Sequence, residues 1–383
     1  MRTTGDQQLL KRINRSVLLR LVRGQPGLSR ARLAQHSGLT KSTVSVLVRE
    51  LLDEGWLSEA SAPVAAAGLG RPSTPLRIND QDRVLLGVEI GVHQLRVVSV
   101  SLTGQVQDTV QVPLQDKDVQ VVCRQTTTLV QQAWRTLADR SLVLSGVGIC
   151  LPGAIDEGAG LVRFAPNLGW RDIPFFAMLR QALGSVGVPA TSLHLHNDAD
   201  AAALGEYEFA DGDGAGSQAL IFVSCDVGVG AGIVLNDHLF TGARGMAGEI
   251  GHSIMEVGGA LCSCGRRGCA ETFIGARALR TPDGAQRAGQ ALGVLIQNLD
   301  VMFNPHVVVL GGQSCSDHPT LLATASKTAA HFAESAGVTA PVVRAARYGI
   351  LAAAVGAAAV AWHHQLRPMQ QRVQPPVTQL ELA

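Results

Sequence analysis

The order of strand-like and helix-like segments after about residue 82 is the feature that most restricts the fold of this chain. Apolar runs such as "VLLGVEIG", "LRVVSVSL" and "ALIFVSC" have the length and the Val, Leu and Ile content of buried strands. Segments with helical spacing separate them, at about 119–138, 174–183, 284–302 and 320–334 and from Asp198 onward. Two successive series of this kind predict an α/β fold in which two lobes, within residues 82–364, flank a cleft.

The same region contains no segment that is typical of a membrane helix. The stretch "GILAAAVGAAAVAW" is shorter than the roughly 18 apolar residues of a membrane span, so it predicts a buried helix. The first residues, "MRTTGDQQLLKRINR", lack the apolar core of a signal peptide. We therefore expect a cytoplasmic protein with reduced thiols, and a disordered tail at 365–383.

Residues 1–80 differ from the rest of the chain in charge. They hold 12 Lys and Arg against 6 Asp and Glu, a balance of +6, whereas the remainder holds 20 against 25, a balance of −5. Three short helices are predicted between residues 14 and 57, with Ser29 and Thr40 as N-caps and Gly38 as a terminator. Two short helices joined by a glycine-containing turn are typical of a helix-turn-helix. The basic balance favours a polyanionic partner.

The third of these helices is predicted to enter the major groove of double-stranded DNA with its first residues. Its spacing places Val44, Val46 and Leu47 on the buried side. The segment that follows predicts a wing of two strands around "GLGRP", a shape that suits a minor groove. A bundle that only mediates dimerisation would show the same three helices, but the charge favours DNA binding. The candidate DNA-binding residues are Arg30, Lys41, Ser42, Thr43, Ser45, Arg49 and Arg71.

One histidine and three cysteines are concentrated between residues 251 and 271. His252, Cys262, Cys264 and Cys269 have the spacing H-x9-C-x-C-x4-C, among glycines that let a loop fold back on itself. Three thiolates and an imidazole suit tetrahedral zinc, and four protein ligands imply a closed, structural site. The alternatives are a disulfide, which a reducing compartment disfavours, or unrelated buried cysteines. The latter is what we expect of Cys123, Cys150, Cys225 and Cys315.

At this motif the chain resembles one family. The segments "AGEIGH" and "CSCGRRGCAE" are similar to the signature of the ROK family (repressors, open reading frames and kinases). The segments "LPGAID", "APNLGW", "NDADAAALGE" and "FNPHVVVLGG" also stand in the family's order. The resemblance extends from about Asn14 to Trp362 and is to the members with an N-terminal winged helix-turn-helix. It implies the actin-like ATPase fold of sugar kinases, with two α/β lobes that close on a sugar.

The resemblance also assigns sugar contacts to the matching positions. Carboxylates and amides suit sugar hydroxyls, and each buried polar group left unpaired costs about 1–3 kcal/mol. We expect one ring nitrogen of His252 to bind zinc and the other to face the sugar. The alternative is that Glu249 and Glu271 are surface charges and that Asn197 with Asp198 caps a helix. The candidate sugar-binding residues are Asn167, Asn197, Asp198, Glu249, His252 and Glu271.

Asp198 matches the residue that acts as the catalytic base in the family's kinases, but the phosphate side departs from the family pattern. "EIGVH" stands where the kinases have Asp-x-Gly-Gly-Thr, so Val92 and His93 crowd a loop that should cradle phosphates. Asp226 opens a segment that is normally Gly-Thr-Gly, which places a carboxylate opposite triphosphate oxygens. Gly311–Gly312, which match the adenosine side, remain. We therefore expect neither ATP binding nor catalysis.

These patterns predict a sugar-responsive DNA-binding transcriptional regulator, most simply a repressor of carbohydrate uptake or catabolism genes. Its effector would be a sugar or sugar phosphate, and a homodimer or homotetramer is expected because helix-turn-helix proteins commonly bind two half-sites. Retention of Asp198 leaves an alternative open, an ATP-dependent kinase of hexoses or N-acetylhexosamines with an appended DNA-binding domain. A third possibility is that the sugar lobe binds a protein partner instead of a sugar.

Overall fold

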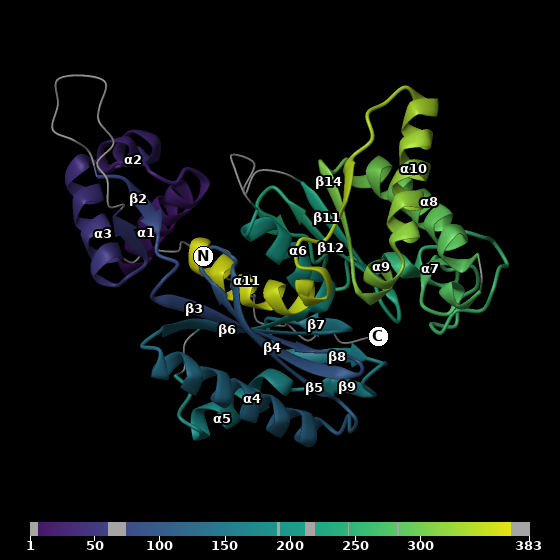
Figure 1. Cartoon of the computed structure of the whole chain (residues 1–383), viewed down its shortest axis with the longest axis horizontal. Coiled ribbons are helices and arrows are strands. Elements are labelled where there is room, and N and C mark those ends of the chain that lie inside the picture. The colour runs from purple at the N-terminus through teal and green to yellow at the C-terminus, as the bar shows by residue number, and fades with distance from the viewer. Residues whose placement is uncertain are drawn as a thin grey trace, which may run out of the picture.

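The structure is a computed structural model that describes residues 7–59, 74–189, 192–210, 219–243, 245–281 and 283–368. Within these ranges the chain forms an N-terminal head followed by two α/β lobes (Figure 1), which confirms the predicted fold class. No helix in these ranges is both long enough and apolar enough to cross a membrane.

The head consists of three helices and a two-stranded antiparallel sheet. Ser29 Oγ accepts a hydrogen bond from the Arg32 N–H, and Thr40 Oγ1 accepts one from the Thr43 N–H, so both predicted N-caps are confirmed. Gly38 ends the second helix with φ 72°, as predicted. The elements are α1 (Gln7–Gly24), α2 (Arg30–Ser37), α3 (Lys41–Asp53), β1 (Leu57–Glu59) and β2 (Leu76–Ile78).

Two details of the head differ from the sequence prediction. The first helix begins at Gln7, before the predicted start at residue 14. Val46 is 56% exposed, whereas Val48 is fully buried. Residues two apart on a helix point in nearly opposite directions, so Val46 faces away from the core side that Val44 and Val48 share. The tip of the wing, including Arg71, lies outside the described residues.

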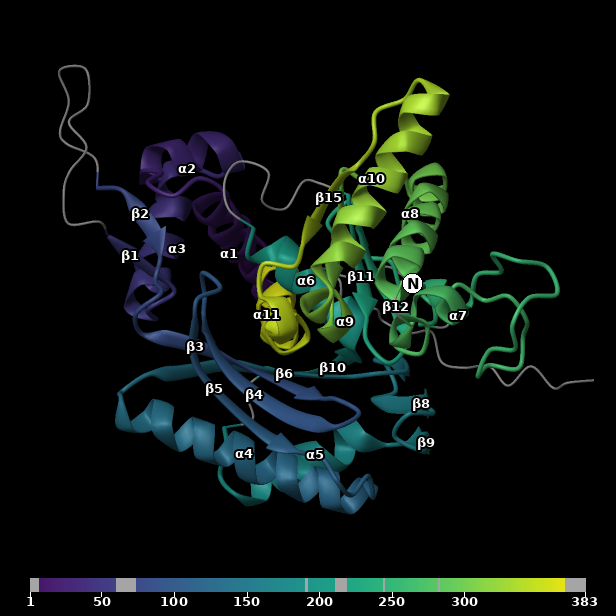
Figure 2. The same ribbon diagram turned by 45° about the vertical axis from the view of Figure 1, so that its right-hand side comes forward.

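The first lobe is built on a five-stranded sheet with the order β10-β6-β3-β4-β5. Helices α4 and α5 cover one face of this sheet, and α11 lies on the other (Figures 1 and 2). The elements are β3 (Arg83–Ile90), β4 (Gln94–Ser101), β5 (Val106–Pro113), α4 (Val119–Asp139), β6 (Val143–Leu151), α5 (Phe175–Ser185) and β10 (Ser192–Asn197). A small sheet that the sequence did not indicate is inserted here, formed by β7 (Ala154–Asp156), β8 (Leu161–Ala165) and β9 (Trp170–Ile173).

The second lobe contains a five-stranded sheet with the order β13-β12-β11-β14-β15. Helix α6 packs on one face, and the apolar sides of α8 and α10 pack on the other. The elements are α6 (Asp198–Glu208), β11 (Leu220–Cys225), β12 (Val229–Leu235), β13 (His238–Leu239), α7 (Glu271–Ile274), α8 (Gly284–Phe303), β14 (Val307–Gly311), α9 (Gln313–Asp317), α10 (Pro319–Ala336) and β15 (Val342–Ala345). Short 3-10 turns occur at Ile250–His252, Ala278–Arg280 and Gly349–Leu351.

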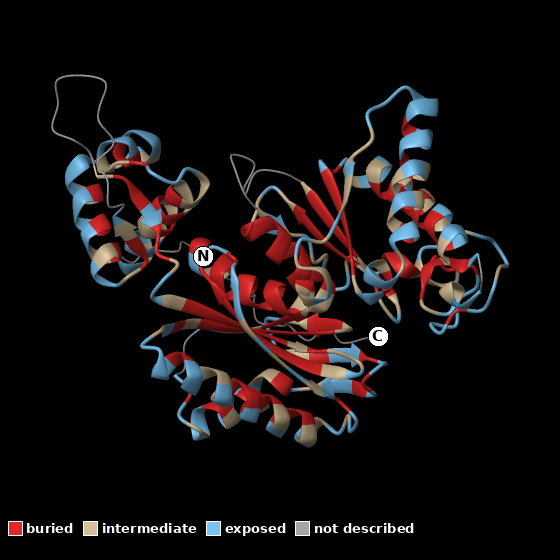
Figure 3. Cartoon of the chain, viewed as in Figure 1, coloured by how far each residue is buried: buried red, intermediate tan, exposed pale blue. Residues whose placement is uncertain are grey.

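Helix α11 (Ala352–Leu366) confirms the predicted buried helix and is buried along almost its whole length (Figure 3). Glycines let its backbone approach its neighbours closely. A Cβ at Gly87 of β3 would collide with the carbonyl oxygen of Ala354, and one at Gly356 would collide with that of Ala201 in α6. Only small residues fit such contacts, which explains the alanine and glycine content of the helix.

Helix α11 also joins the head to the lobes. Trp362 stacks on Trp56 of the head, with ring centroids 5.9 Å apart and planes 12° from parallel, and Arg83 lies over the Trp56 ring at 4.1 Å. The prediction that the tail begins at residue 365 is wrong for the first residues of that range. The helix continues to Leu366, which packs in the apolar core that α11 shares with the head, and Arg367 is buried beside Glu208 and Asp237.

Candidate functional site

The four residues of the cysteine motif converge in the loop between Ile250–His252 and α7. One ligand atom from each of His252, Cys262, Cys264 and Cys269 lies within 4.8 Å of the others. The Cys262 Sγ to His252 Nδ1 distance and the Cys264 Sγ to Cys269 Sγ distance are both 3.7 Å. Ligand atoms on a tetrahedral zinc ion, with Zn–S near 2.3 Å, lie about 3.8 Å apart. The group therefore has the donors and the spacing of a tetrahedral metal site, and all seven cysteines are free of disulfides.

Backbone pairing brings these ligands together. Ile254 pairs with Cys269 and Leu261 with Arg267 in two antiparallel bridges, and the Cys262 N–H donates to the Arg266 carbonyl at 2.8 Å. Gly268 has φ 76°, and a Cβ there would collide with the backbone of Glu256. The glycines of the motif therefore serve the close return of the loop, as the sequence indicated.

The loop places three of the predicted sugar-binding residues side by side. His252 turns Nδ1 toward the thiols and Nε2 toward Glu249, whose Oε2 lies 4.0 Å away. Glu271 accepts hydrogen bonds from Ser263 Oγ at 3.2 Å and from the Val229 N–H at 3.3 Å. Burial raises the pKa of Glu249; the negative charge of Glu271 adds to this shift, and His252 opposes it.

Asn197 and Asp198 begin α6. Asn197 Oδ1 caps the helix by accepting from the Ala199 and Asp200 N–H groups, and its Nδ2 donates to the Gly153 carbonyl at 2.9 Å. Capping, the alternative raised from the sequence, is therefore present at Asn197. Burial, and then the charges of Asp226 and Glu249, raise the pKa of Asp198 to about 6. Asp198 thus belongs to the same electrostatic environment as Glu249.

Asn167 comes from the first lobe, in a loop that none of the other candidates shares. It is exposed on the loop between β8 and β9, where its carbonyl oxygen accepts a hydrogen bond from Lys117 Nζ at 2.8 Å. Within the described ranges its side chain makes no hydrogen bond to the other five candidates. The structure therefore brings Glu249, His252 and Glu271 together, and the contact of Asn167 with a sugar stays a prediction.

The segments that match phosphate loops hold a group of carboxylates. Glu89 pairs with Arg96 at 2.6 Å, directly opposite in the β3–β4 register, and Arg96 is itself almost fully buried. Burial, together with the charges of Asp226 and Asp198, raises the pKa of Glu89 to about 7. Arg96 was not among the residues selected from the sequence, although an arginine opposite a glutamate in adjacent strands is a cross-strand pair that spacing can reveal.

Asp226 fills part of the space between two turns. Its Oδ1 accepts from the Gln313 N–H and its Oδ2 from Ser224 Oγ at 3.1 Å. A Cβ at Gly312 would lie 2.8 Å from Asp226 Oδ2. The first free N–H of α9 is thus already bonded to a carboxylate of the protein.

Most of the candidate DNA-binding residues are exposed on α3. Lys41, Ser42, Ser45 and Arg49 share the outer surface with Val46. Thr43 is half-buried, and its hydroxyl bonds to that of Thr40 at 2.8 Å. Arg30, at the start of α2, pairs with Glu59 of β1 at 2.9 Å. The roles of these residues, and that of Arg71, remain predictions.

A buried charge network, which the sequence did not reveal, joins the head to both lobes. Glu208 ends α6 with a fully buried side chain, and it pairs with Arg23 of α1 and with Arg367. His363 Nδ1 lies 2.6 Å from Glu208 Oε1, and Arg367 also pairs with Asp237 at 3.2 Å. Burial and the charge of Arg367 lower the pKa of Arg23 to about 10.

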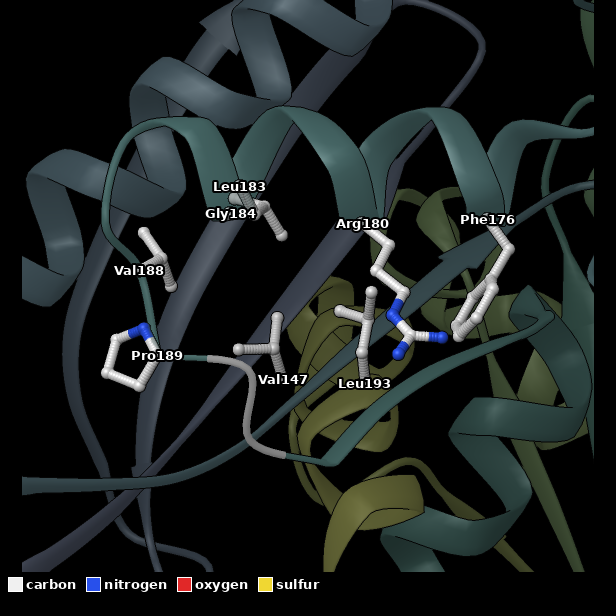
Figure 4. A pocket seen from close by; sticks show the side chains of 8 residues that line it. All are labelled: Val147, Phe176, Arg180, Leu183, Gly184, Val188, Pro189 and Leu193. Carbon is white, nitrogen blue, oxygen red and sulfur yellow. The ribbon is translucent and has the colours of Figure 1, made fainter.

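A cavity of about 180 Å³ lies away from these groups, between α5 and the strands β6 and β10 (Figure 4). Its walls are largely apolar, and Arg180 extends across it toward Phe176 (Figure 4). None of the predicted site residues lines it. It lies on the opposite face of the sheet from α11 and has no polar groups arranged as sugar partners.

Comparison with known proteins shows which families and relatives share this sequence. The ROK family profile matches residues 85–287 and 280–364, and that of the IclR helix-turn-helix domain matches residues 16–61. The chain is 27% identical over 343 residues to the xylose repressor of Bacillus subtilis (strain 168), covering 83% of this chain and 86% of that protein. It is 31% identical over 277 residues to the xylose repressor of Caldicellulosiruptor bescii, covering 72% of this chain and 67% of that protein.

Solved structures share the fold. The crystal structure of a ROK family transcriptional regulator, a homologue of the Escherichia coli MLC protein, has a TM-score of 0.74 at 23% identity, over 93% of this chain and 97% of that one. A ROK family glucokinase from Streptomyces griseus, solved with glucose and AMPPNP, has a TM-score of 0.61 at 25% identity, over 73% of this chain and 99% of that one.

The fold and the head together define a helix-turn-helix regulator built on a sugar-kinase-like body. The chain belongs to the ROK family. The predicted class of function, a sugar-responsive DNA-binding regulator, is confirmed.

Proposed function

We propose that this chain represses its target genes until a monosaccharide or its phosphate binds beside the cysteine loop. The observation that carries the proposal is the contact between the metal-type cluster and the polar group next to it: His252 belongs to both, and Glu271 contacts Cys262 at 3.7 Å. Two carboxylates and an imidazole nitrogen, brought together by this loop, suit hydroxyl groups of a sugar. Asp198, Asn197 and Asn167 are proposed to complete the site.

The cysteine loop is proposed to hold structural zinc. The donor set of three sulfurs and one nitrogen, and the 3.7 Å separations, fit this ion. Bound zinc would fix the ring of His252, so that Nε2 keeps its orientation toward Glu249.

The matched relatives suggest which sugar to test first. Several are named xylose repressors, and one matched regulator of Escherichia coli is named an N-acetylglucosamine repressor. We propose an aldose or its phosphate as the effector class, with xylose, N-acetylglucosamine and their phosphates as first candidates. The target genes would serve uptake or catabolism of the same sugar, and the protein would act in the cytoplasm.

Helix α6 is proposed to carry the signal to the head. Its first residue, Asp198, belongs to the sugar site, and its last residue, Glu208, pairs with Arg23 of the head. An α-helix of 11 residues is a rod about 16 Å long, so a shift at one end moves the other. A sugar that binds the two positions of α6 with different affinities would change the head's orientation. We propose a homodimer or homotetramer, in which this change alters the spacing of two heads on double-stranded DNA.

Phosphoryl transfer to the sugar is not proposed. Transfer depends on positioning and on neutralising the triphosphate charge, whereas Glu89, Asp198 and Asp226 put three carboxylates near the segments that match phosphate loops. Retention of Asp198 favours the kinase as a second candidate. A coupled assay for ADP release with xylose, hexoses and N-acetylhexosamines would decide between the regulator and the kinase. A turnover of about 1 per second would lie in the usual range of enzymes and favour the kinase.

The test of the regulatory proposal is fluorescence anisotropy with the DNA upstream of the protein's own gene, at about 100 mM salt, where binding to backbone phosphates alone is weak. We expect specific binding that one sugar of a panel reverses. Glu249→Gln should keep DNA binding and lose the response, because it removes a sugar partner without removing a metal ligand. Glu256→Gln, an exposed carboxylate of the same loop, is the matched control. A wild-type protein that binds no DNA specifically, or whose binding no sugar changes, would contradict the proposal.

A further inference from the structure

A second group of metal-binding side chains lies where the edge strand of the first lobe meets the end of α11. His194 and His196 are two residues apart in β10, so their side chains project from the same face of the sheet. Leu193 projects from the other face and lines the cavity beneath α5 (Figure 4). His364, in the last turn of α11, stacks on His194 with ring centroids 4.0 Å apart and planes 3° from parallel. Glu157 follows β7 directly.

Three of these residues bring ligand atoms together. One such atom from each of Glu157, His196 and His364 lies within 4.8 Å of the others, and His196 Nδ1 is 2.6 Å from Glu157 Oε1. His196 is only 3% exposed. The Nδ1 atoms of His196 and His364 are both buried without a hydrogen-bond partner among the described residues, since the approach of Glu157 lacks hydrogen-bond geometry. A buried polar atom left unpaired costs about 1–3 kcal/mol, so two of them in one cluster point to a ligand.

The donor types indicate what that ligand is. Two imidazole nitrogens and one carboxylate form the protein part of zinc sites that keep a fourth position open, and imidazole also suits cobalt, nickel and copper. Nitrogen and oxygen ligands of one tetrahedral ion lie about 3.4 Å apart. The His196 Nδ1 to Glu157 Oε1 distance of 2.6 Å is shorter than this, so metal binding requires the 40% exposed Glu157 side chain to shift outward.

We propose that Glu157, His196 and His364 form a second metal site, which binds a divalent transition-metal ion such as zinc, cobalt or nickel. It contains no thiolate and shares no residue with the cysteine loop. A bound ion ties the segment after β7, the edge strand β10 and the end of α11 to one another. His363, the neighbour of His364, contacts Glu208, so the ion also holds the part of α11 that borders the head. The site does not depend on the proposed response to sugar.

Cobalt titration of the full-length, metal-free protein tests the proposal. Cobalt at the cysteine loop gives sulfur-to-metal charge-transfer absorption, whereas cobalt at the histidines gives only d–d bands, so the two ions are counted separately. We expect two ions per chain. His364→Phe keeps a ring that stacks on His194 but removes the nitrogen, and Glu157→Gln removes the carboxylate at an exposed position. Each substitution should lower the affinity for the second ion by at least about 100-fold, since loss of a residue that only hydrogen-bonds to a ligand already lowers metal affinity by about 10–100-fold.

His194→Phe is the matched control, because it changes a ring of the same stack that is not one of the three ligands; it should bind both ions as the wild type does. Three results would overturn the proposal: a wild-type chain that binds only the ion at the thiolates, unchanged affinity for the second ion in Glu157→Gln, or the same loss in His194→Phe as in His364→Phe. Glu157→Gln decides the outcome if His364→Phe fails to fold, because its side chain lies outside the core.

Discussion

The buried charge network at Glu208 yields the most demanding prediction. Glu208→Gln keeps the size of the side chain but removes the negative charge that pairs with both Arg23 and Arg367. The pKa of Arg23, about 10 against an ordinary 12.5, already corresponds to about 3 kcal/mol against its charged form. Without Glu208 the two guanidinium groups would repel each other in a site from which water is largely excluded.

Removal of one partner from a buried ion pair typically costs about 3–5 kcal/mol, because the remaining charge stays buried without compensation. We therefore expect Glu208→Gln to lower the free energy of unfolding by about 3–5 kcal/mol, and the melting temperature by roughly 10 °C.

Urea unfolding followed by circular dichroism measures this loss. Asp108→Asn is the control, since it breaks a 2.6 Å ion pair with Arg140 in which the side chains of Asp108 and Arg140 are 40% and 50% exposed. Such a surface pair is worth about 0–1 kcal/mol. If Glu208→Gln destabilised the protein no more than Asp108→Asn, the buried network would contribute nothing to stability, and its proposed part in joining head and lobes would have no energetic basis.

Three further predictions concern the site and the head. Asp198→Asn should stabilise the protein by about 3 kcal/mol at pH 8, because burial raises the pKa of the folded carboxyl from 3.8 to about 6 and makes its ionised form costly. This gain should shrink as the pH falls from 6 toward 4 and vanish below about pH 3, where the carboxyl is protonated in both the folded and the unfolded chain; urea denaturation across that range measures it. Cys264→Ser, at an exposed position, should lose the metal of the cysteine loop and with it the calorimetric signal of sugar binding. Cys315→Ser, the control, should retain both, and unchanged metal content in Cys264→Ser would exclude the proposed ligand set. Lys41→Ala should weaken DNA binding about equally for all sequences and reduce the slope of log affinity against log salt by about 1, and an unchanged slope would remove Lys41 from the DNA surface.

Local signals predicted much of the fold. Apolar runs and helical spacing located the main strands and helices, and the hydroxyl residues Ser29 and Thr40 marked helix starts because capping depends only on neighbouring residues. The small sheet of β7, β8 and β9 was missed, since its strands are 3, 5 and 4 residues long, too short for a periodic pattern.

In the candidate site, too, residues close in sequence were predicted and contacts between distant residues were missed. The metal ligands are close in sequence, so their spacing was sufficient to group them. Asn197 was assigned a sugar contact through family resemblance, yet its amide is already bonded to Gly153 and to the start of α6. Glu208 carries no local sign of its importance, because its partners lie 155 to 185 positions away in the sequence.

The glycine contacts around α11 have a mechanical consequence. Gly87 and Gly148 bring the sheet of the first lobe against the backbone of this helix, Gly205 and Gly356 do the same between α6 and α11, and Gly232 does so between α6 and β12. One layer can slide over another only where side chains between them can repack. At these glycines the backbones touch directly, so no side chain is available to repack. We therefore expect the lobes to move by hinge rotation about the crossing of α6 and α11, since these contacts oppose sliding of the layers. A rotation about so fixed a pivot grows with distance from it, so the largest displacements belong to the far ends of α8, α10 and the head.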